Sequence, residues 1–206
     1  WDYGLWLSVG GNVTTLCDNT TINNTAIENT GFIFMSNETY SLKMLKQYGA
    51  QYILVFVTFD ANGNFVDWAG GDNGKWTWMA QISGAAMPRF LGGNYTDSVS
   101  AWTNQTTFGN FTTNSQGQSV WAWNNVGGNS TVYKLMSWAK NRWCTVNGVT
   151  DPDAANVTQP IYFTEAFFSA PSRSTSSSNY GGLVPMVALY KINWQQYYAD
   201  YPDKSG

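Results

Sequence analysis

The pattern of hydrophobic and polar residues first becomes regular near residue 38. Apolar side chains in residues 38–48 recur on one helical face, Ser36 or Asn37 occupies the N-cap position, and Gly49 follows the last turn. This arrangement predicts a helix. Residues 52–57 then form a continuous apolar run with β-branched members, which favours a strand buried on both faces. A helix followed by a central strand predicts an α/β-type unit at the heart of the domain.

Two later segments also have helical periodicity. Residues 72–83 follow a pair of glycines, with Asp72 as the predicted N-cap and Gly84 as the stop. Ser130 is the predicted cap of a longer segment, whose apolar residues recur at helical spacing over 132–143. We therefore predict two further helices, one in each half of the chain.

The last third of the chain carries two predicted strands. Residues 161–168 and 186–192 have the apolar, β-branched and aromatic character that favours strands. The Ser-rich stretch 169–179 between them is expected to be a mobile loop. Two strands with such a connection are expected to pair as a hairpin.

Two segments are dominated by small polar residues. Residues 9–30, rich in Gly, Asn and Thr, predict irregular coil. Residues 92–131 contain one charged residue, Asp97, and the alternation within 119–123 predicts a strand. We interpret 92–131 as a polar, β-rich or irregular insertion. The predicted fold class is α+β, a mixed helix-and-strand central domain carrying this insertion, within one domain of 206 residues.

Composition narrows the possible functions. Charged residues make up 11% of the chain, against about 25% in average globular proteins. The formal net charge is -3 and no basic cluster is present, so a nucleic acid is excluded as the main partner. Aromatic residues make up 17%, enough to bury a core, so the chain is not of the disordered class. The longest uncharged apolar run, 52–59, is far shorter than the roughly 18 residues that indicate a membrane span.

Sequons of the form Asn-x-Ser/Thr point to an extracytoplasmic location, because they are acceptor sites for N-linked glycans. The chain has nine: Asn12, Asn19, Asn23, Asn37, Asn94, Asn104, Asn110, Asn129 and Asn156. Cys17 and Cys144 allow one disulfide, which would close a long loop and contribute about 4 to 5 kcal/mol, or they are two buried free thiols. With two Cys and no His, a metal site is disfavoured.

The first four residues, Trp1-Asp2-Tyr3-Gly4, place a carboxylate between two aromatic rings. This is a compact way to hold Asp2 in a partly dry pocket, where it would accept charge-assisted hydrogen bonds. The alternative is that Asp2 caps a helix through residues 5–7, with its charge at the positive helix end.

One face of the helix predicted over 72–83 combines charge with apolar side chains. At 100° per residue, Asp72, Lys75, Met79 and Ile82 fall within a sector of about 80°. The alternative here is an exposed ion pair between Asp72 and Lys75, worth a few tenths of a kcal/mol, above a Met and Ile stripe that faces the core.

Three stretches together resemble one enzyme family, in the family's order. Trp1-Asp2-Tyr3-Gly4 resembles the end of the W-W-D-Y-G signature of the oligosaccharyltransferase catalytic subunit. Residues 17–25, which contain Asp18-Asn19-Thr20 and Asn23-Asn24-Thr25, resemble the D-N-x-T-x-N-N-T stretch of archaeal and eukaryotic members. Residues 72–79 are similar to the D-x-x-K-x-x-x-M motif of those members. The chain is identified on these motifs with the archaeal type, and the first Trp of the signature is absent because the chain begins after it.

The resemblance implies that residues 1–206 are the C-terminal domain on the extracellular face of the cell membrane. The membrane domain, absent from this chain, would bind Mn or Mg and the lipid-linked oligosaccharide and would supply the catalytic acidic residues. This chain would recognise an acceptor polypeptide with Asn-x-Ser/Thr and would be inactive alone. Asp2 would accept a hydrogen bond from the acceptor hydroxyl, Trp1 would form one wall of the pocket, and Lys75 and Met79 would complete it. The supporting motif residues are Tyr3, Gly4, Asp72 and Ile82. Asn23 is the glycosylation site that the resemblance favours most.

Other classes fit parts of the sequence. The 11 Trp and 12 Tyr residues and the polar insertion would suit a surface carbohydrate-binding module, because aromatic faces stack on sugar rings. The sequons alone would suit a structural cell-surface glycoprotein. A hydrolase has the least support, since the chain has no His and no recognisable acidic pair or Cys-based nucleophile.

Overall fold

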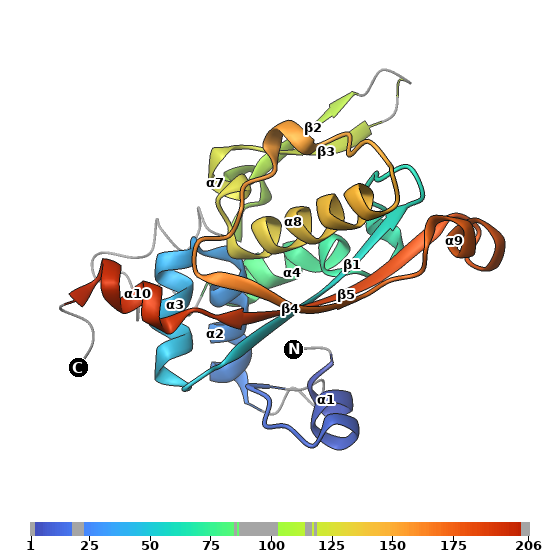
Figure 1. The fold of residues 1–206 in the computed structure, drawn as a ribbon. Coiled ribbons are helices and arrows are strands. Elements are labelled where there is room, and N and C mark those ends of the chain that lie inside the picture. The colour runs from blue at the N-terminus through green and yellow to red at the C-terminus, as the bar shows by residue number, and fades with distance from the viewer. Residues whose placement is uncertain are drawn as a thin grey trace. The chain divides into compact units, whose positions relative to one another are not determined.

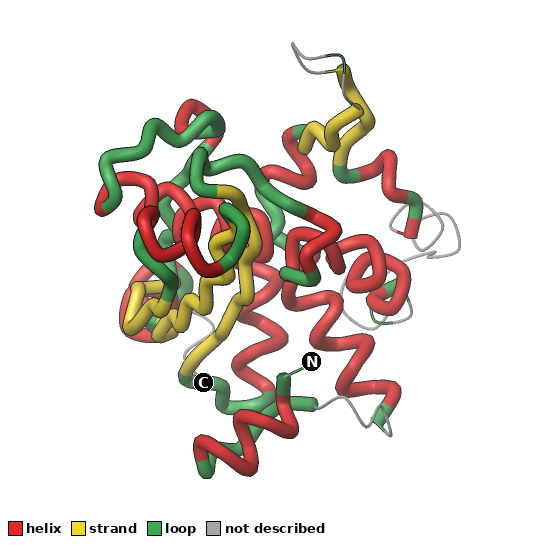
Figure 2. Tube along the Cα trace, turned by 90° about the vertical axis from the view of Figure 1, so that its right-hand side faces the viewer, coloured by secondary structure: helices red, strands yellow, loops and turns green. Residues whose placement is uncertain are grey.

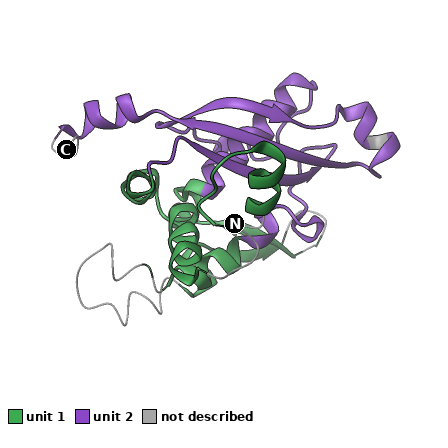
Figure 3. Cartoon of the chain, turned by 90° about the horizontal axis from the view of Figure 1, so that it is seen from below, with its two compact units in different colours: residues 1–48, 76–131 green, residues 49–75, 132–206 purple. Residues whose placement is uncertain are grey.

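The computed structural model of the chain describes residues 3–17, 23–84, 86, 103–113, 117 and 119–202. These residues form helices and small antiparallel sheets (Figures 1 and 2), which confirms the predicted α+β class. The chain divides into two compact units (Figure 3): unit 1 is 1–48 with 76–131, and unit 2 is 49–75 with 132–206. Helix α4 (Asp72–Ser83) contains one boundary between them. Within the described ranges, no helix is both long enough and apolar enough to cross a membrane.

Unit 1 begins with three helices, α1 (Gly4–Gly11), α2 (Asn24–Met35) and α3 (Glu38–Gln47). Helix α3 confirms the first predicted helix. Asn37 caps it by accepting the backbone N–H of Tyr40 at 3.1 Å, and Gly49 beyond its end has a φ of +60°. Helix α2 packs against α3, and the Asn29 amide donates a hydrogen bond to the Tyr48 hydroxyl at 2.7 Å.

The prediction of irregular coil over 9–30 is wrong, because helix α2 covers the second part of that range. Asn23 caps α2 by accepting the backbone N–H of Ala26 at 3.1 Å. Helix α2 contains Asn, Thr and Gly, which are weak helix formers, so tertiary packing has to stabilise it. Gly31 permits that packing, since a Cβ there would lie 2.7 Å from the carbonyl oxygen of Met79. The backbones of α2 and α4 therefore approach closely within unit 1.

A β-hairpin forms the described part of the predicted insertion. Strands β2 (Gly109–Thr113) and β3 (Ser119–Trp123) pair antiparallel, which confirms the strand predicted at 119–123. The short helices η2 (Gln105–Thr107) and α7 (Asn125–Gly128) flank the hairpin. The ring centroids of Trp121 and Trp123 lie 4.8 and 4.7 Å from that of Trp76 on α4. Aromatic packing therefore attaches the hairpin to the rest of unit 1.

Unit 2 contains an antiparallel sheet with the strand order β1-β5-β4, built from β1 (Tyr52–Asp60), β4 (Phe163–Ser169) and β5 (Leu183–Ile192). The residues of one sheet face pair across β1 and β5 and are buried: Ile53, Val55, Val57 and Phe59 opposite Tyr190, Ala188, Met186 and Val184. Helix α8 (Thr131–Val146) packs on this face, where the Tyr190 hydroxyl donates to the Leu135 carbonyl at 2.8 Å. This face is the core of unit 2.

The position of β1 corrects the predicted α/β-type unit. Strand β1 lies at an edge of the sheet, its neighbour β5 runs antiparallel to it, and β5 is the central strand. The second face of β1 is only partly covered, because Leu54 and Phe56 are half-buried and Tyr52 is 51% exposed. A continuous apolar run does not separate a strand with two buried faces from an edge strand with one, so the prediction was wrong in this respect.

The predicted hairpin of unit 2 is confirmed in the pairing of β4 with β5. The connection between them is not only a loop, because α9 (Arg173–Asn179) forms inside the predicted loop 169–179. The Ser172 hydroxyl caps α9 by accepting the backbone N–H of Thr175 at 3.3 Å. Helix α8 begins directly after Ser130, as predicted. The remaining described elements are η1 (Asp67–Ala69), η3 (Ala154–Asn156) and α10 (Trp194–Asp200).

Candidate functional site

The structure describes the first motif of the predicted acceptor pocket only from Tyr3 onward. Trp1 and Asp2 lie outside the described residues, so their approach to Lys75 and Met79 stays a prediction. The helix that the alternative interpretation requires is present as α1. Its N-cap is Tyr3, which makes no side-chain capping bond, and the buried Gly4 is its first residue.

The other four predicted residues all lie on α4, at the spacing that the sequence indicates. Met79 is 1% exposed and Asp72 is 7% exposed, while Lys75 and Ile82 are half-buried. Asp72 is the first residue of the helix, and its carboxylate accepts the backbone N–H of Phe56 on β1 at 2.8 Å. The Asp72 carboxylate is thus buried and bonded to the sheet, unlike the exposed surface group that the alternative assumes.

Asn73 makes several hydrogen bonds at the start of α4. Its Oδ1 accepts the backbone N–H of Thr58 at 3.0 Å and the Thr58 hydroxyl at 3.2 Å. Its Nδ2 donates to the Asp67 carboxylate at 3.0 Å. The sequence patterns did not indicate these residues, since the bonds join positions 6 and 15 residues apart. The only local signal is the pair Gly71 and Gly74 around Asn73, which marks a close backbone approach.

The electrostatics of this network centre on Asp67. Burial of its carboxyl group raises the pKa of Asp67 above the ordinary 3.8, although the residue as a whole is exposed. The hydrogen bond that Asn73 donates opposes that rise, because it stabilises the ionised form. The hydrogen bond from Asn73 therefore both positions the Asp67 carboxylate and stabilises its negative charge.

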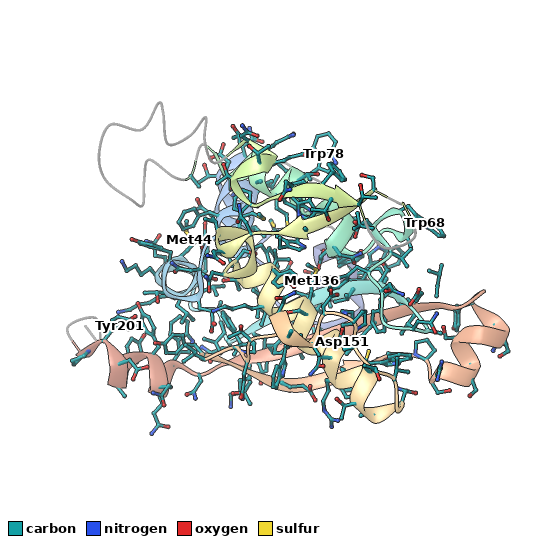
Figure 4. All side chains as sticks on the ribbon, turned by 90° about the horizontal axis from the view of Figure 1, so that it is seen from above. Met44, Trp68, Trp78, Met136, Asp151 and Tyr201 are labelled. Carbon is teal, nitrogen blue, oxygen red and sulfur yellow. The ribbon has the colours of Figure 1, made fainter. Side chains whose placement is uncertain are left out.

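A second polar cluster lies inside unit 2, away from the predicted site residues in sequence. The Lys140 ammonium is 0% exposed and donates to the Gly63 carbonyl at 2.7 Å, to Asp151, and to Asp153 at 3.0 Å. It also lies 4.8 Å from the ring centroid of Phe65. Asp151 (Figure 4) is buried, and its Oδ2 has no hydrogen-bond partner. The cluster ties α8 to the turn after β1 and to the segment after α8.

Both cysteines are free thiols in the structure, which contradicts the disulfide alternative. Of the two, Cys144 is buried as the free-thiol alternative expects, while Cys17 is only half-buried. The Cys17 sulfur lies 3.2 Å from the Thr30 hydroxyl, within hydrogen-bond distance. Cys144 is 1% exposed, and burial, followed by the nearby Asp151, raises its pKa to about 11. Burial and the charges of Asp153 and Asp151 likewise raise the pKa of Tyr133 to about 12. Both groups are therefore held neutral by the fold.

These raised pKa values predict alkaline destabilisation. The folded state keeps the Cys144 proton at pH values where the unfolded chain releases it. The contribution of this thiol to the free energy of unfolding is therefore fully present below about pH 9 and is lost as the pH rises to about 11. We expect Cys144→Ala to remove about 1 kcal/mol per pH unit from the slope of unfolding free energy in that window. Urea unfolding at steps between pH 7 and pH 11 measures it. If the unfolding free energies of the native protein and of Cys144→Ala fell equally steeply above pH 9, the raised pKa of Cys144 would be contradicted.

The described sequon asparagines are all exposed: Asn12, Asn23, Asn37, Asn104, Asn110, Asn129 and Asn156. Asn19 and Asn94 lie outside the described residues. Asn23, Asn37 and Asn104 cap helices through Oδ1, which leaves Nδ2, the atom that carries an N-linked glycan, out of the capping bond. Asn129 differs, because the hydroxyl of its sequon belongs to Thr131, which is 0% exposed.

Three tryptophans among the described residues have largely exposed side chains. Trp6 on α1, Trp68 on η1 and Trp78 on α4 are 74%, 82% and 61% exposed, and they stand on different elements (Figure 4 labels Trp68 and Trp78). Trp121 and Trp123 of the insertion pack on Trp76 instead of facing solvent.

The part of the chain that the structure describes also contains no group of three or more His, Cys, Asp or Glu side chains able to hold a metal ion.

Comparison with known proteins gives relatives for part of the chain. No family model matches it. It is 36% identical over 88 residues to the dolichyl-diphosphooligosaccharide–protein glycosyltransferase subunit STT3 of Saccharomyces cerevisiae, which covers 43% of this chain and 12% of that protein. The corresponding subunit of Caenorhabditis elegans is 34% identical over 89 residues, 43% of this chain and 11% of that protein. The corresponding subunit of Dictyostelium discoideum is 34% identical over 95 residues, which is 46% of this chain and 13% of that protein.

The matched region thus spans about an eighth of the length of these relatives. It agrees with the resemblance found in the motifs, and the helix that carries one motif has the predicted bounds. Over that region, the chain is homologous to the oligosaccharyltransferase subunit STT3.

Proposed function

We propose that this chain is the acceptor-recognition domain of a membrane oligosaccharyltransferase of the archaeal type, on the extracellular face of the membrane. The complete enzyme transfers a lipid-linked oligosaccharide to Asn in Asn-x-Ser/Thr. The observation that carries the proposal is the homology to the subunit STT3 at 34% to 36% identity. The single helix α4, which holds Asp72, Lys75 and Met79 in the motif's spacing, supports it.

Recognition of the acceptor hydroxyl follows from simple chemistry. A fixed carboxylate at Asp2 accepts a hydrogen bond from Ser or Thr, with Trp1, Lys75 and Met79 around it. An acceptor without the hydroxyl leaves that carboxylate desolvated and unpaired, which costs about 1 to 3 kcal/mol. The same site therefore binds Asn-x-Ser/Thr and rejects other tripeptides.

The remaining chemistry belongs to the membrane domain in this proposal. That domain supplies the divalent metal, Mn or Mg, the acidic residues that activate the acceptor amide, and the site for the lipid-linked donor. This chain contributes binding and orientation of the acceptor, and no catalytic residue.

We expect this chain alone to transfer no sugar, while the complete enzyme transfers it to an Asn-x-Thr peptide. Both are incubated with lipid-linked donor and Mn²⁺, and glycopeptide is quantified by mass spectrometry. A Gln-x-Thr peptide is the matched control, because it keeps the hydroxyl but lacks the acceptor amide. Transfer by this chain above the no-enzyme background would contradict the division of roles, and no transfer by the complete enzyme would contradict the function itself.

We also expect the protein to carry N-linked glycans in its native host, with Asn23 the site that we expect above all others to be modified. Asn129 is expected to be modified only before folding, because Thr131 donates its hydroxyl to the Ser36 carbonyl at 2.9 Å in the fold. Glycopeptide mass spectrometry of native protein measures occupancy at each sequon. Treatment of the folded, unmodified protein with the complete enzyme should then leave Asn129 unmodified. Nine unmodified asparagines in native protein would contradict the extracellular location.

The carbohydrate-binding alternative makes a different prediction. A binding module would bind free glycans and ignore an Asn-x-Thr peptide, so calorimetry with both ligands separates the two functions.

A further inference from the structure

The outer edge of β1 meets side chains where a further strand would otherwise pair. Strand β1 has β5 on one side only. Alternate N–H groups of an edge strand point away from its neighbour, and those of Phe56 and Thr58 are two residues apart. The Phe56 N–H donates to the Asp72 carboxylate at 2.8 Å, and the Thr58 N–H donates to the Asn73 Oδ1 at 3.0 Å. The first two residues of α4 thus accept two N–H groups of this edge, beside the antiparallel bridge that joins Phe59 to Phe65.

The hydrogen-bonding neighbours of position 73 require an amide side chain there. Asn73 is 4% exposed, and its side chain accepts from Thr58 while it donates to Asp67. An alanine there would leave the Thr58 N–H without this acceptor. An aspartate would keep the acceptor but would face the Asp67 carboxylate with a second negative charge. Among asparagine, alanine and aspartate, only asparagine has both the acceptor that Thr58 needs and the donor that Asp67 needs.

The backbone around Asn73 is equally constrained. A Cβ on Gly71 would lie 2.7 Å from the Thr58 backbone nitrogen and would overlap the Asn73 Oδ1. A Cβ on Gly74 would overlap the Asp67 carbonyl oxygen. Glycine at both positions therefore lets the first turn of α4 lie directly on β1 and η1.

We propose that Asn73 is a positioning residue for acceptor recognition, which fixes the first turn of α4 against β1 and thereby sets the position of Lys75. Lys75 lies two residues after Asn73 in the same helical turn, so any rotation or shift of that turn moves it directly. This inference rests on the proposed function, in which Lys75 forms part of the acceptor pocket. Asp67 acts through Asn73, because its carboxylate accepts the hydrogen bond that the Asn73 amide donates.

The test is kinetic and uses the complete enzyme in its membrane. We expect Asn73→Asp to raise the KM for an Asn-x-Thr peptide at least fivefold, with kcat changed less than twofold, because the chemical step belongs to other residues. The paired exchange Asp67→Asn with Asn73→Asp restores the match of donor and acceptor, since the amide introduced at position 67 then donates to the carboxylate introduced at position 73. We expect that double variant to return KM to within twofold of the native value.

Asn29→Asp is the matched control, because Asn29 is also a buried asparagine, 7% exposed, that donates from Nδ2. It should lower the melting temperature without changing KM. Asp67→Ala is the second variant, chosen because Asp67 is exposed and its truncation leaves no cavity in the core. We expect it to raise KM about threefold.

An unchanged KM in folded Asn73→Asp or folded Asp67→Ala overturns the inference, as does a raised KM that the paired exchange fails to restore. Failure of the native enzyme to transfer any glycan would instead remove the proposed function. The two failures are therefore distinguishable in one set of assays.

Discussion

Replacement of Lys140 by Met should lower the free energy of unfolding by about 3 to 5 kcal/mol. The Lys140 ammonium is 0% exposed and is the cation shared by Asp151 and Asp153. Its removal takes away the cation that pairs with the Asp151 carboxylate, whose side chain is 1% exposed. The Oδ2 of Asp151 already has no partner, so the carboxylate cannot be satisfied by its other oxygen. Equilibrium urea unfolding of the chain measures the change.

Two further variants separate loss of charge from loss of a long side chain. Lys191→Met removes an exposed lysine from β5 and should change stability by less than about 0.5 kcal/mol. Lys140→Met combined with Asp151→Asn removes both charges, and it should be more stable than Lys140→Met alone because no unpaired carboxylate stays buried. Equal losses for Lys140→Met and Lys191→Met would contradict the role assigned to the cluster.

In the complete enzyme, Asp2→Asn and Asp2→Ala should each lower kcat/KM for an Asn-x-Thr acceptor about ten- to a hundredfold, equivalent to about 1.5 to 3 kcal/mol. Asn keeps the shape of the side chain but replaces a charged acceptor with a neutral one. Ala removes the acceptor entirely and should be at least as severe. Steady-state transfer assays with a range of peptide concentrations give both constants.

The capping interpretation of Asp2 predicts a different pattern. Asn caps a helix about as well as Asp, so Asp2→Asn would be nearly neutral, and Asp2→Ala would lower stability and leave catalysis intact. Helix α1 has Tyr3 at its N-cap, which already weakens that interpretation. A melting curve for each variant, measured beside the kinetics, shows which pattern holds.

Local signals in the sequence were sufficient for several elements. Helix α4 runs from Asp72 to Ser83, as its periodicity predicts, and α8 begins after Ser130 with its apolar positions buried. Strands β1, β4 and β5 form where apolar runs predict them. Helix α2 was missed because its residues have weak helix propensity, and its stability comes from packing of Gly31 against α4.

Features that depend on distant contacts could not be predicted. The order of strands in the sheet, which places β1 at an edge, has no local signature. Asp72 looked like a helix cap, yet its carboxylate bonds to Phe56 on that edge, and Asn73 bonds to Thr58 beside it. Lys140, in the middle of a helical pattern, gave no sign that it would be buried between two carboxylates. In the candidate site, the spacing of the motif residues on α4 was predictable from the sequence. The hydrogen bonds that attach the first turn of α4 to β1 were not.

The most direct test of acceptor recognition by this chain is one ratio, measured in the complete enzyme. It is kcat/KM for an Asn-x-Thr peptide divided by kcat/KM for the same peptide with 2-aminobutyrate, which lacks the hydroxyl, in place of Thr. We expect a large ratio with native Asp2, since the hydroxyl pairs with its carboxylate, and a ratio near one with Asp2→Ala, because that variant no longer senses the hydroxyl. A folded Asp2→Ala enzyme that keeps the native ratio would contradict the account.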